Sequence, residues 1–279
     1  METKPTLVLA GTGKIGRRVV ERLTARDLPV RIGSRSGEPH FDWDDRSTWA
    51  PVLEGVGSVY VAHHWDALPG AAETLGSFAE VAVESGVRRL VLMSGRGEEE
   101  ADRGQQAVRD SGAELTILSS TWFAQNFSED YWRDMVQGGE VALPAGETPE
   151  PFVDADDIAD VAVAALTDDR HIGEVYELTG PRLLTFAEAV LEISRALGRE
   201  IRYLPISIED FAAAAAEQGV PSEVVEMLSL IFSEVLDGRN AHLADGVQRA
   251  LGREPRDFSD YARAAAATGV WDPAASRAA

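Results

Sequence analysis

The chain opens on a short apolar run that passes directly into a glycine-rich turn. Residues 6–10 read Thr-Leu-Val-Leu-Ala, the pattern G-x-G-x-x-G follows at 11–16, and apolar residues then recur at helical spacing up to Leu23. A continuous apolar run is typical of a strand buried on both faces of a parallel sheet. The first glycine permits a tight turn, the second lets the backbone approach a pyrophosphate, and the third lets helix and strand pack closely. The turn therefore predicts a dinucleotide-binding βαβ unit, in which free amides and the helix dipole hold the anion; the alternative is a glycine turn without a ligand. The residues expected to bind the cofactor here are Gly11, Thr12, Gly13, Lys14, Ile15 and Gly16.

The first half of the chain alternates further apolar runs with helical patterns. Expected strands cover 29–33, 58–62, 89–94 and 114–118, and expected helices cover 68–85 and 103–111. Strands separated by helices of this length indicate βαβ units and a parallel sheet. We therefore expect an α/β fold with a Rossmann-type doubly wound parallel sheet.

The second half is less regular. It predicts a helix over 122–136, a strand over 151–153, a helix over 155–166, a strand over 174–178, and a helix from a Thr185–Glu188 capping box to Gly198. We expect a dinucleotide-binding domain over 1–150, to which 151–180 return, and a small, mostly helical substrate lobe over 181–279.

Composition excludes several classes of partner. Acidic residues number 47 against 26 basic ones, so the net charge is −21. Because nucleic-acid affinity depends mainly on Lys and Arg contacts to phosphate, DNA or RNA binding is not expected. Cysteine is absent, which removes disulfides, thiolate nucleophiles and Cys-ligated zinc. The first apolar run is too short for a signal peptide and none reaches the roughly 18 residues of a membrane span, so we expect a cytoplasmic protein without membrane partners.

The residues after the second strand indicate which dinucleotide would bind. An NAD site places Asp or Glu there, about 20 residues past the glycines, to bind both ribose hydroxyls. Here residues 33–37 read Gly-Ser-Arg-Ser-Gly, and the first acid is Glu38. A guanidinium between two hydroxyls suits a 2′-phosphate. Ser34, Arg35 and Ser36 therefore predict NADPH or NADP as the cofactor; the alternative is an exposed loop arginine.

The carboxyl ends of the other strands should complete the site, because ligands of open parallel sheets bind there. These ends are 62–64 (Ala-His-His), 94–96 (Ser-Gly-Arg) and 119–123 (Ser-Ser-Thr-Trp-Phe). Ala62 and Ser94 are further expected cofactor contacts, and Ser94 is the candidate for hydrogen bonding near the nicotinamide. His63 or His64 either lines the pocket and donates a proton or is structural.

Two more segments suggest ligand contacts. Asp42, where the chain should return beneath the adenine, can accept a hydrogen bond from the adenine amino group; the alternative is a turn with buried aromatic residues. The aromatic residues that follow Thr121, together with the amide of Asn126, are expected to form a wall suited to a flat apolar substrate. The alternative is that they pack in the hydrophobic core, because their spacing is helical. The candidate wall is Trp122, Phe123, Asn126, Phe127, Tyr131 and Trp132. The candidate catalytic residues are Ser94, His63 and Asn126, and the candidate substrate-binding residues are His64, Trp122, Phe123, Phe127 and Tyr131.

Several mechanisms are excluded by residue count. A conventional short-chain dehydrogenase needs Tyr-x-x-x-Lys, yet the only lysines are Lys4 and Lys14, and neither follows a tyrosine by four residues. Schiff-base catalysis by lysine is not expected for the same reason. Metal binding is not expected either, because the adjacent His63 and His64 would point to opposite faces and the acids between 154 and 160 open a helix.

Five segments together resemble the NmrA-like atypical short-chain dehydrogenases, and in particular the ergot-alkaloid iminium reductases. They are GTGKIGR at 11–17, SRS at 34–36, FDW at 41–43, TWFAQNFSE at 121–129 and PFVDADDIA at 151–159. The resemblance runs nearly end to end. It implies a Rossmann domain with a small C-terminal substrate lobe, NADPH use and loss of the Tyr/Lys pair. It also implies hydride delivery to an already activated acceptor, where positioning replaces an acid catalyst.

One departure leaves two functions open. The strand before Thr121 commonly ends Leu-Arg-Pro in such proteins, whereas residues 118–120 here read Leu-Ser-Ser. The first hypothesis is an NADPH-dependent reductase of an imine, iminium, quinone or enone, of the kind found in secondary metabolism. The second is a non-catalytic NADP(H) sensor that regulates a protein partner, since the family also contains such members. The sequence leaves open whether the chain is a monomer or a homodimer.

Overall fold

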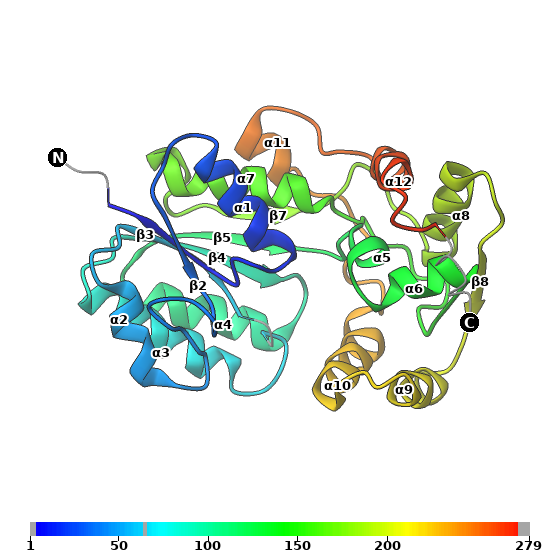
Figure 1. Cartoon of the computed structure of the whole chain (residues 1–279), viewed down its shortest axis with the longest axis horizontal. Helices are drawn as coiled ribbons and strands as arrows, with labels where there is room; N and C mark the ends of the chain where they lie inside the picture. Colours follow the sequence, from blue (N-terminus) through cyan, green and yellow to red (C-terminus); the bar gives the residue numbers. More distant parts are fainter. Residues whose placement is uncertain (1–3, 64–65, 273–279) are drawn as a thin grey trace, which may run out of the picture. The chain divides into compact units, whose positions relative to one another are not determined.

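The computed structural model describes residues 4–63 and 66–272, and the chain divides into two compact units (Figure 1). Unit 1 comprises 1–120, 155–178 and 245–253, and unit 2 comprises 121–154, 179–244 and 254–279. This division differs from the expected boundaries at 150 and 180. Residues 121–154 pack with the later part of the chain, and 245–253 pack in the unit that contains the large sheet.

Unit 1 is built on a six-stranded parallel sheet with the order β2-β1-β3-β4-β5-β7. The strands are β1 (Thr6–Leu9), β2 (Val30–Gly33), β3 (Ser58–Ala62), β4 (Arg89–Gly95), β5 (Glu114–Ser120) and β7 (Val175–Leu178). The central strands are almost wholly buried, which explains why they read as continuous apolar runs. The predicted Rossmann-type sheet is confirmed.

Helices cover both faces of this sheet (Figure 1). One face carries α1 (Lys14–Thr24), α7 (Ala155–Thr167) and α11 (Gly246–Leu251), and the other carries α2 (Trp49–Leu53), α3 (Ala71–Glu84) and α4 (Glu99–Asp110). Short helical turns, η1 (Arg46–Thr48) and η2 (Asp169–His171), precede α2 and β7. Two layers of helices around one parallel sheet leave the carboxyl ends of the strands as the place for a ligand.

Arginines join the helices of the first face. Arg22 of α1 donates to Asp156 at 2.7 Å and to Asp160 at 2.6 Å, both in α7. Arg253, directly after α11, pairs with the fully buried Asp157 at 2.7 Å and with Asp160 at 2.6 Å. The acids that begin α7 therefore bind arginines in addition to complementing the helix dipole.

Unit 2 contains a small parallel pair, β6 (Glu140–Leu143) with β8 (Arg202–Pro205), and a set of helices. The helices are α5 (Asn126–Glu129), α6 (Tyr131–Gly138), α8 (Phe186–Leu197), α9 (Ile208–Glu217), α10 (Ser222–Leu230), η3 (Ile231–Val235) and α12 (Phe258–Ala267). The capping box predicted for α8 is present, with Thr185 and Glu188 each accepting from the other's backbone amide. Within the described residues, no helix has both the length and the apolar character that crossing a membrane requires.

Two expectations about unit 2 are wrong, and one pair of strands was missed. The helix expected over 122–136 is two helices, because Asp130 between α5 and α6 has an extended backbone. The strand expected over 151–153 makes only an isolated bridge between Val153 and Phe123. The pairing of β6 with β8 was not predicted, because each strand is only four residues long.

Candidate functional site

The glycine turn joins β1 to α1 and leaves part of its backbone at the surface. The amide of Gly13 donates to the carbonyl of Ala10 at 2.8 Å, while Thr12 and Gly13 are exposed. The first turn of α1 contains no acidic residue. No carboxylate there neutralises the positive end of the helix dipole. A Cβ on Gly16 would lie 2.1 Å from the Ala10 carbonyl oxygen, which confirms the packing role expected of the third glycine. The arrangement suits an anion at the N-terminus of α1.

The loop after β2 presents an arginine. Arg35 and Ser36 are exposed and Ser34 is half-buried. The loop is held by its backbone, because the Ser34 carbonyl accepts from Gly37 at 3.1 Å and from Phe41 at 3.0 Å. Among the described residues, the Arg35 guanidinium has no hydrogen bond or ion pair. A charged fork that no carboxylate neutralises is well suited to a phosphate.

The segment after this loop is a turn anchored by aromatic side chains. Phe41 and Trp43 are buried, whereas Asp42 is half-buried. One Asp42 carboxylate oxygen accepts from the backbone amide of Asp44 at 3.1 Å. The indole of Trp43 donates to the carbonyl of Ala62 at 3.3 Å, which ties the turn to the end of β3.

Of the two histidines expected near the end of β3, the structure describes only His63. The ring of His63 lies 4.8 Å from that of Trp43 in an edge-to-face arrangement, so the aromatic turn orients this side chain. His64 lies outside the described residues.

The carboxyl end of β4 brings together a buried serine and two carboxyl groups. Ser94 is 3% exposed, and its hydroxyl accepts from the amide of Gln105 at 3.0 Å. The backbone amide of Gly95 donates to the carboxylate of Asp66 at 2.9 Å. A Cβ on Gly95 would lie 2.2–2.4 Å from the carboxyl atoms of Glu98, so this carboxyl group occupies the space that any other residue at 95 would fill.

The two carboxyl groups beside Gly95 are unusually poor acids. Removal from water raises the pKa of Asp66 to about 6. Removal from water, together with the negative charges of Asp66 and Asp102, raises the pKa of Glu98 to about 8. Perturbed carboxyl groups at the carboxyl ends of parallel strands are typical of functional sites. The sequence analysis missed Asp66 and Glu98; their only sequence signal is that each closely follows a strand end.

The aromatic residues expected to form a wall lie in unit 2. The ring of Trp122 is half-buried and stacks on that of Phe232 at 5.0 Å, with Trp132 5.4 Å away. Phe123 and Asn126 are also half-buried. Phe127, by contrast, is fully buried within the core of the unit, so the prediction that its ring contacts a substrate is wrong. The side chain of Tyr131 lies outside the described part of the structure.

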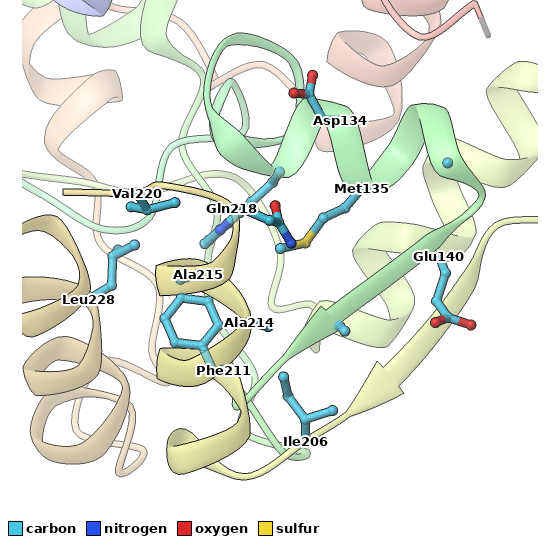
Figure 2. A pocket seen from close by; sticks show the side chains of 13 residues that line it. Asp134, Met135, Glu140, Ile206, Phe211, Ala214, Ala215, Gln218, Val220 and Leu228 are labelled. Carbon is cyan, nitrogen blue, oxygen red and sulfur yellow. The ribbon is translucent and has the colours of Figure 1, made fainter. Parts of the chain in front are cut away.

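Unit 2 also contains a cavity of about 350 Å³ (Figure 2). Its lining comes largely from α6, β6 and α9 and is mostly apolar, with Met135, Phe211 and, from α10, Leu228 among its residues. Figure 2 labels Gln218, a polar residue of the lining, together with Met135 and Phe211. Most ligand pockets combine an apolar lining with a few polar groups that orient the ligand. Of the residues that line it, the sequence analysis singled out only Trp132.

The order of the parallel sheet, the glycine turn between β1 and α1, and the exposed arginine after β2 define a nucleotide-binding protein of the Rossmann type. The family model described as "NmrA-like family" matches residues 103–262. The chain belongs to this family, as the resemblance predicted.

Relatives from several organisms match nearly the whole chain. The chain is 32% identical to the uncharacterized oxidoreductase YesF of Bacillus subtilis, with 97% of this chain and 99% of YesF covered. It is 30% identical to the NAD(P)H azoreductase of Xenophilus azovorans, over 94% and 98% of the two chains. It is also 30% identical to the agroclavine dehydrogenase of Claviceps fusiformis, over 91% and 95%.

Solved structures support the fold. The triphenylmethane reductase of Citrobacter sp., complexed with NADP(H), has a TM-score of 0.76 at 18% identity, covering 94% of this chain and 99% of its own. An NADPH-dependent quinone oxidoreductase of Escherichia coli, complexed with NADPH, has a TM-score of 0.74 at 20% identity over 92% and 98%. The negative transcriptional regulator NmrA, in complex with NADP, has a TM-score of 0.69 at 17% identity over 94% and 95%.

Proposed function

We propose that this protein is an NADPH-dependent reductase of a small, flat, apolar acceptor: an imine or iminium ion, a quinone or an enone. The observation that carries the proposal is the exposed guanidinium of Arg35, which has no ion-pair or hydrogen-bond partner among residues 4–63 and 66–272 and follows the strand adjacent to the glycine turn. Three features support it further: no acid stands at the end of β2, the relatives are named as oxidoreductases, and a triphenylmethane reductase and a quinone oxidoreductase share the fold.

Each part of the dinucleotide has a matching group in unit 1. The backbone of Gly11, Thr12 and Gly13 holds the pyrophosphate, with Lys14, Ile15 and Gly16 forming the start of the helix behind it. Arg35 binds the 2′-phosphate with the hydroxyls of Ser34 and Ser36. Asp42 accepts from the adenine amino group, and the chain around Ala62 and Ser94 borders the nicotinamide. When bound, the reduced dinucleotide supplies hydride.

The remaining residues orient the acceptor. Ser94, with its hydroxyl fixed by Gln105, hydrogen-bonds near the reacting atoms. His63 of unit 1 and Asn126 of unit 2 are the other candidate catalytic residues. Trp122 and Phe123 contact the flat ring, while Phe127 supports them from the core; His64 and Tyr131 complete the substrate-binding set. The apolar cavity of unit 2, with Gln218 as a polar group in its lining, is of a size that suits a ring system.

The test combines binding with turnover. Calorimetry with NADPH and NADH measures affinity, and absorbance in the nicotinamide band follows oxidation of NADPH with a panel of iminium, quinone and enone compounds. We expect tighter binding of NADPH than of NADH and turnover of at least one class. Absence of binding to either dinucleotide would contradict the whole assignment.

The alternative is a non-catalytic NADP(H) sensor that acts through a protein partner. Absence of the Tyr-x-x-x-Lys pair favours it, and a negative transcriptional regulator shares the fold. Tight binding of NADPH without oxidation across the panel would support the sensor and reject the reductase.

A further inference from the structure

The acceptors named above differ in whether they need a proton. An iminium ion is neutralised by hydride alone, whereas an enone or a quinone must take up hydride and a proton. The Tyr/Lys pair that supplies this proton in conventional short-chain dehydrogenases is missing here. A substitute must hold a proton near neutral pH and lie at the carboxyl ends of the strands.

Two carboxyl groups meet this positional requirement, because both contact Gly95, the last residue of β4. Asp66, from the loop after β3, accepts the Gly95 amide proton at 2.9 Å. The carboxyl group of Glu98 lies over the Cα of Gly95, in the space where a Cβ would be. The next residue toward the amino end of β4 is Ser94, the expected neighbour of the nicotinamide.

The surroundings of this pair favour retention of a proton. Among the described residues neither carboxyl group has an ion-pair partner. The negative charge of Asp102 in α4 raises the pKa of Glu98. The negative charge of Glu177 in β7 in turn raises the pKa of Asp102. Arg96, the cation next to Gly95, is paired with Glu177 at 2.8 Å. Neighbouring carboxyl groups without a cation do not both ionise readily, so the pair holds one proton, in agreement with the raised pKa of Glu98 of about 8.

A buried phenol next to the pair provides a second, independent observation. Tyr60 of β3 is fully buried, and its hydroxyl has no hydrogen-bond partner within the described ranges. Burial and the charge of Asp66 raise its pKa, which places the hydroxyl within electrostatic reach of Asp66. A buried polar group without a partner is uncommon, and this one lies within electrostatic reach of Asp66.

We propose that Glu98, with Asp66 as its partner, donates the proton when this protein reduces an α,β-unsaturated carbonyl compound, a class that includes quinones. The inference rests on the proposed function as a reductase. The acceptor takes hydride at the β-carbon, and the electron pair of its C=C bond shifts so that the carbonyl oxygen gains negative charge. That oxygen takes the proton of the Glu98 carboxyl group, which becomes a carboxylate and regains a proton from solvent. The acceptor gains two electrons, which the reduced dinucleotide loses.

The experiment compares an acceptor that needs a proton with one that does not. Menadione serves as the quinone, and N-methyl-3,4-dihydroisoquinolinium serves as the iminium ion. We expect Glu98→Gln to lower kcat with menadione by roughly 10²–10³-fold, and to leave kcat with the iminium ion within about twofold. Glu99→Gln, which alters the exposed neighbouring carboxylate, is the matched control and should leave both rates unchanged.

A second readout does not depend on turnover. Infrared difference spectra of the free protein should show a protonated carboxyl group at pH 7 that ionises near pH 8 and is missing in Glu98→Gln. Equal menadione rates in the wild type and Glu98→Gln would overturn the donor role and leave the reductase standing. A carboxylate at Glu98 throughout the neutral range would overturn it too. If the wild type binds NADPH and oxidises it with no compound of the panel described above, the reductase proposal fails, and the donor role with it.

Discussion

Gly16 and Ala10 are in such close contact that a Cβ on Gly16 would lie 2.1 Å from the Ala10 carbonyl oxygen and 2.7 Å from its carbonyl carbon. Both neighbours are backbone atoms at the end of β1, so no flexible side chain can move aside. The position of α1, and with it the open glycine turn, therefore depends on this one missing methyl group.

Replacing Gly16 by alanine should lower the free energy of unfolding by roughly 1–3 kcal/mol, because the helix must move away from the strand. Urea unfolding measures the change. Gly138→Ala is the control, since a Cβ there would have no atom within 4 Å and its φ is not in the left-handed region; it should cause no loss. Equal losses in the two variants would contradict the packing role of Gly16.

Replacing Arg35 by alanine should weaken NADPH binding about 10–100-fold and leave NADH binding nearly unchanged. The reason is that a charged hydrogen bond to the 2′-phosphate contributes roughly 1.5–3 kcal/mol. Calorimetry with both dinucleotides measures the ratio. Arg26→Ala, at an exposed arginine near the opposite end of α1, should leave the ratio unchanged; a ratio that Arg35→Ala does not alter would remove the basis for NADPH preference.

The carboxyl pair predicts how stability depends on pH. The folded-state pKa values of about 6 for Asp66 and about 8 for Glu98 lie above the ordinary value of roughly 4 in an unfolded chain. The folded state therefore binds these protons more strongly, and the resulting stabilisation is complete below pH 4 and is lost as the pH rises through 6 and 8. Since glutamine stays neutral, Glu98→Gln should come closest to the wild type near pH 4 and increasingly exceed its stability as the pH rises to 9.

Denaturant midpoints between pH 5 and pH 9 measure this difference, with Glu99→Gln as the control. A constant offset between wild type and Glu98→Gln at all pH values would show that the carboxyl group does not titrate in this range.

Removing the Arg22 guanidinium should destabilise unit 1. Arg22→Ala breaks the hydrogen bonds to Asp156 and Asp160 that join α1 to α7, and hydrogen bonds between charged groups contribute roughly 1.5–3 kcal/mol. Arg133→Ala, which breaks a solvent-exposed pair with Asp134, should cost less than about 1 kcal/mol. Thermal or urea unfolding that finds equal effects would show that the α1–α7 pairs are as weak as a surface pair.

The large sheet was predictable because its strands are buried on both faces, and burial produces continuous apolar runs such as Leu7–Leu9. Unit 2 was less predictable for a physical reason. The pairing of β6 with β8 joins Val141 to Tyr203, which lie far apart in the sequence, and four-residue strands have too little periodicity to detect. The break between α5 and α6 depends on the backbone of Asp130, a residue that helices tolerate.

The candidate site divides in the same way. The glycine turn and the Arg35 loop are local, so consecutive residues reveal them. The acidity of Asp66 and Glu98 depends on a contact between residues 29 positions apart, at Gly95, and on the loss of water around it. No local sequence pattern reveals the contact or the loss of water. Three consecutive glutamates at 98–100 are typical of a charged surface.

The discontinuous course of the chain has a consequence for how the protein can be taken apart. Because unit 1 needs residues from three separate stretches, ending at Arg253, no single truncation releases it whole. During synthesis, Arg253, which pairs with Asp157, emerges only after residues 121–154 and 179–244 of the other unit have been made. The nucleotide-binding unit therefore reaches its full set of contacts only when the chain has been made as far as Arg253.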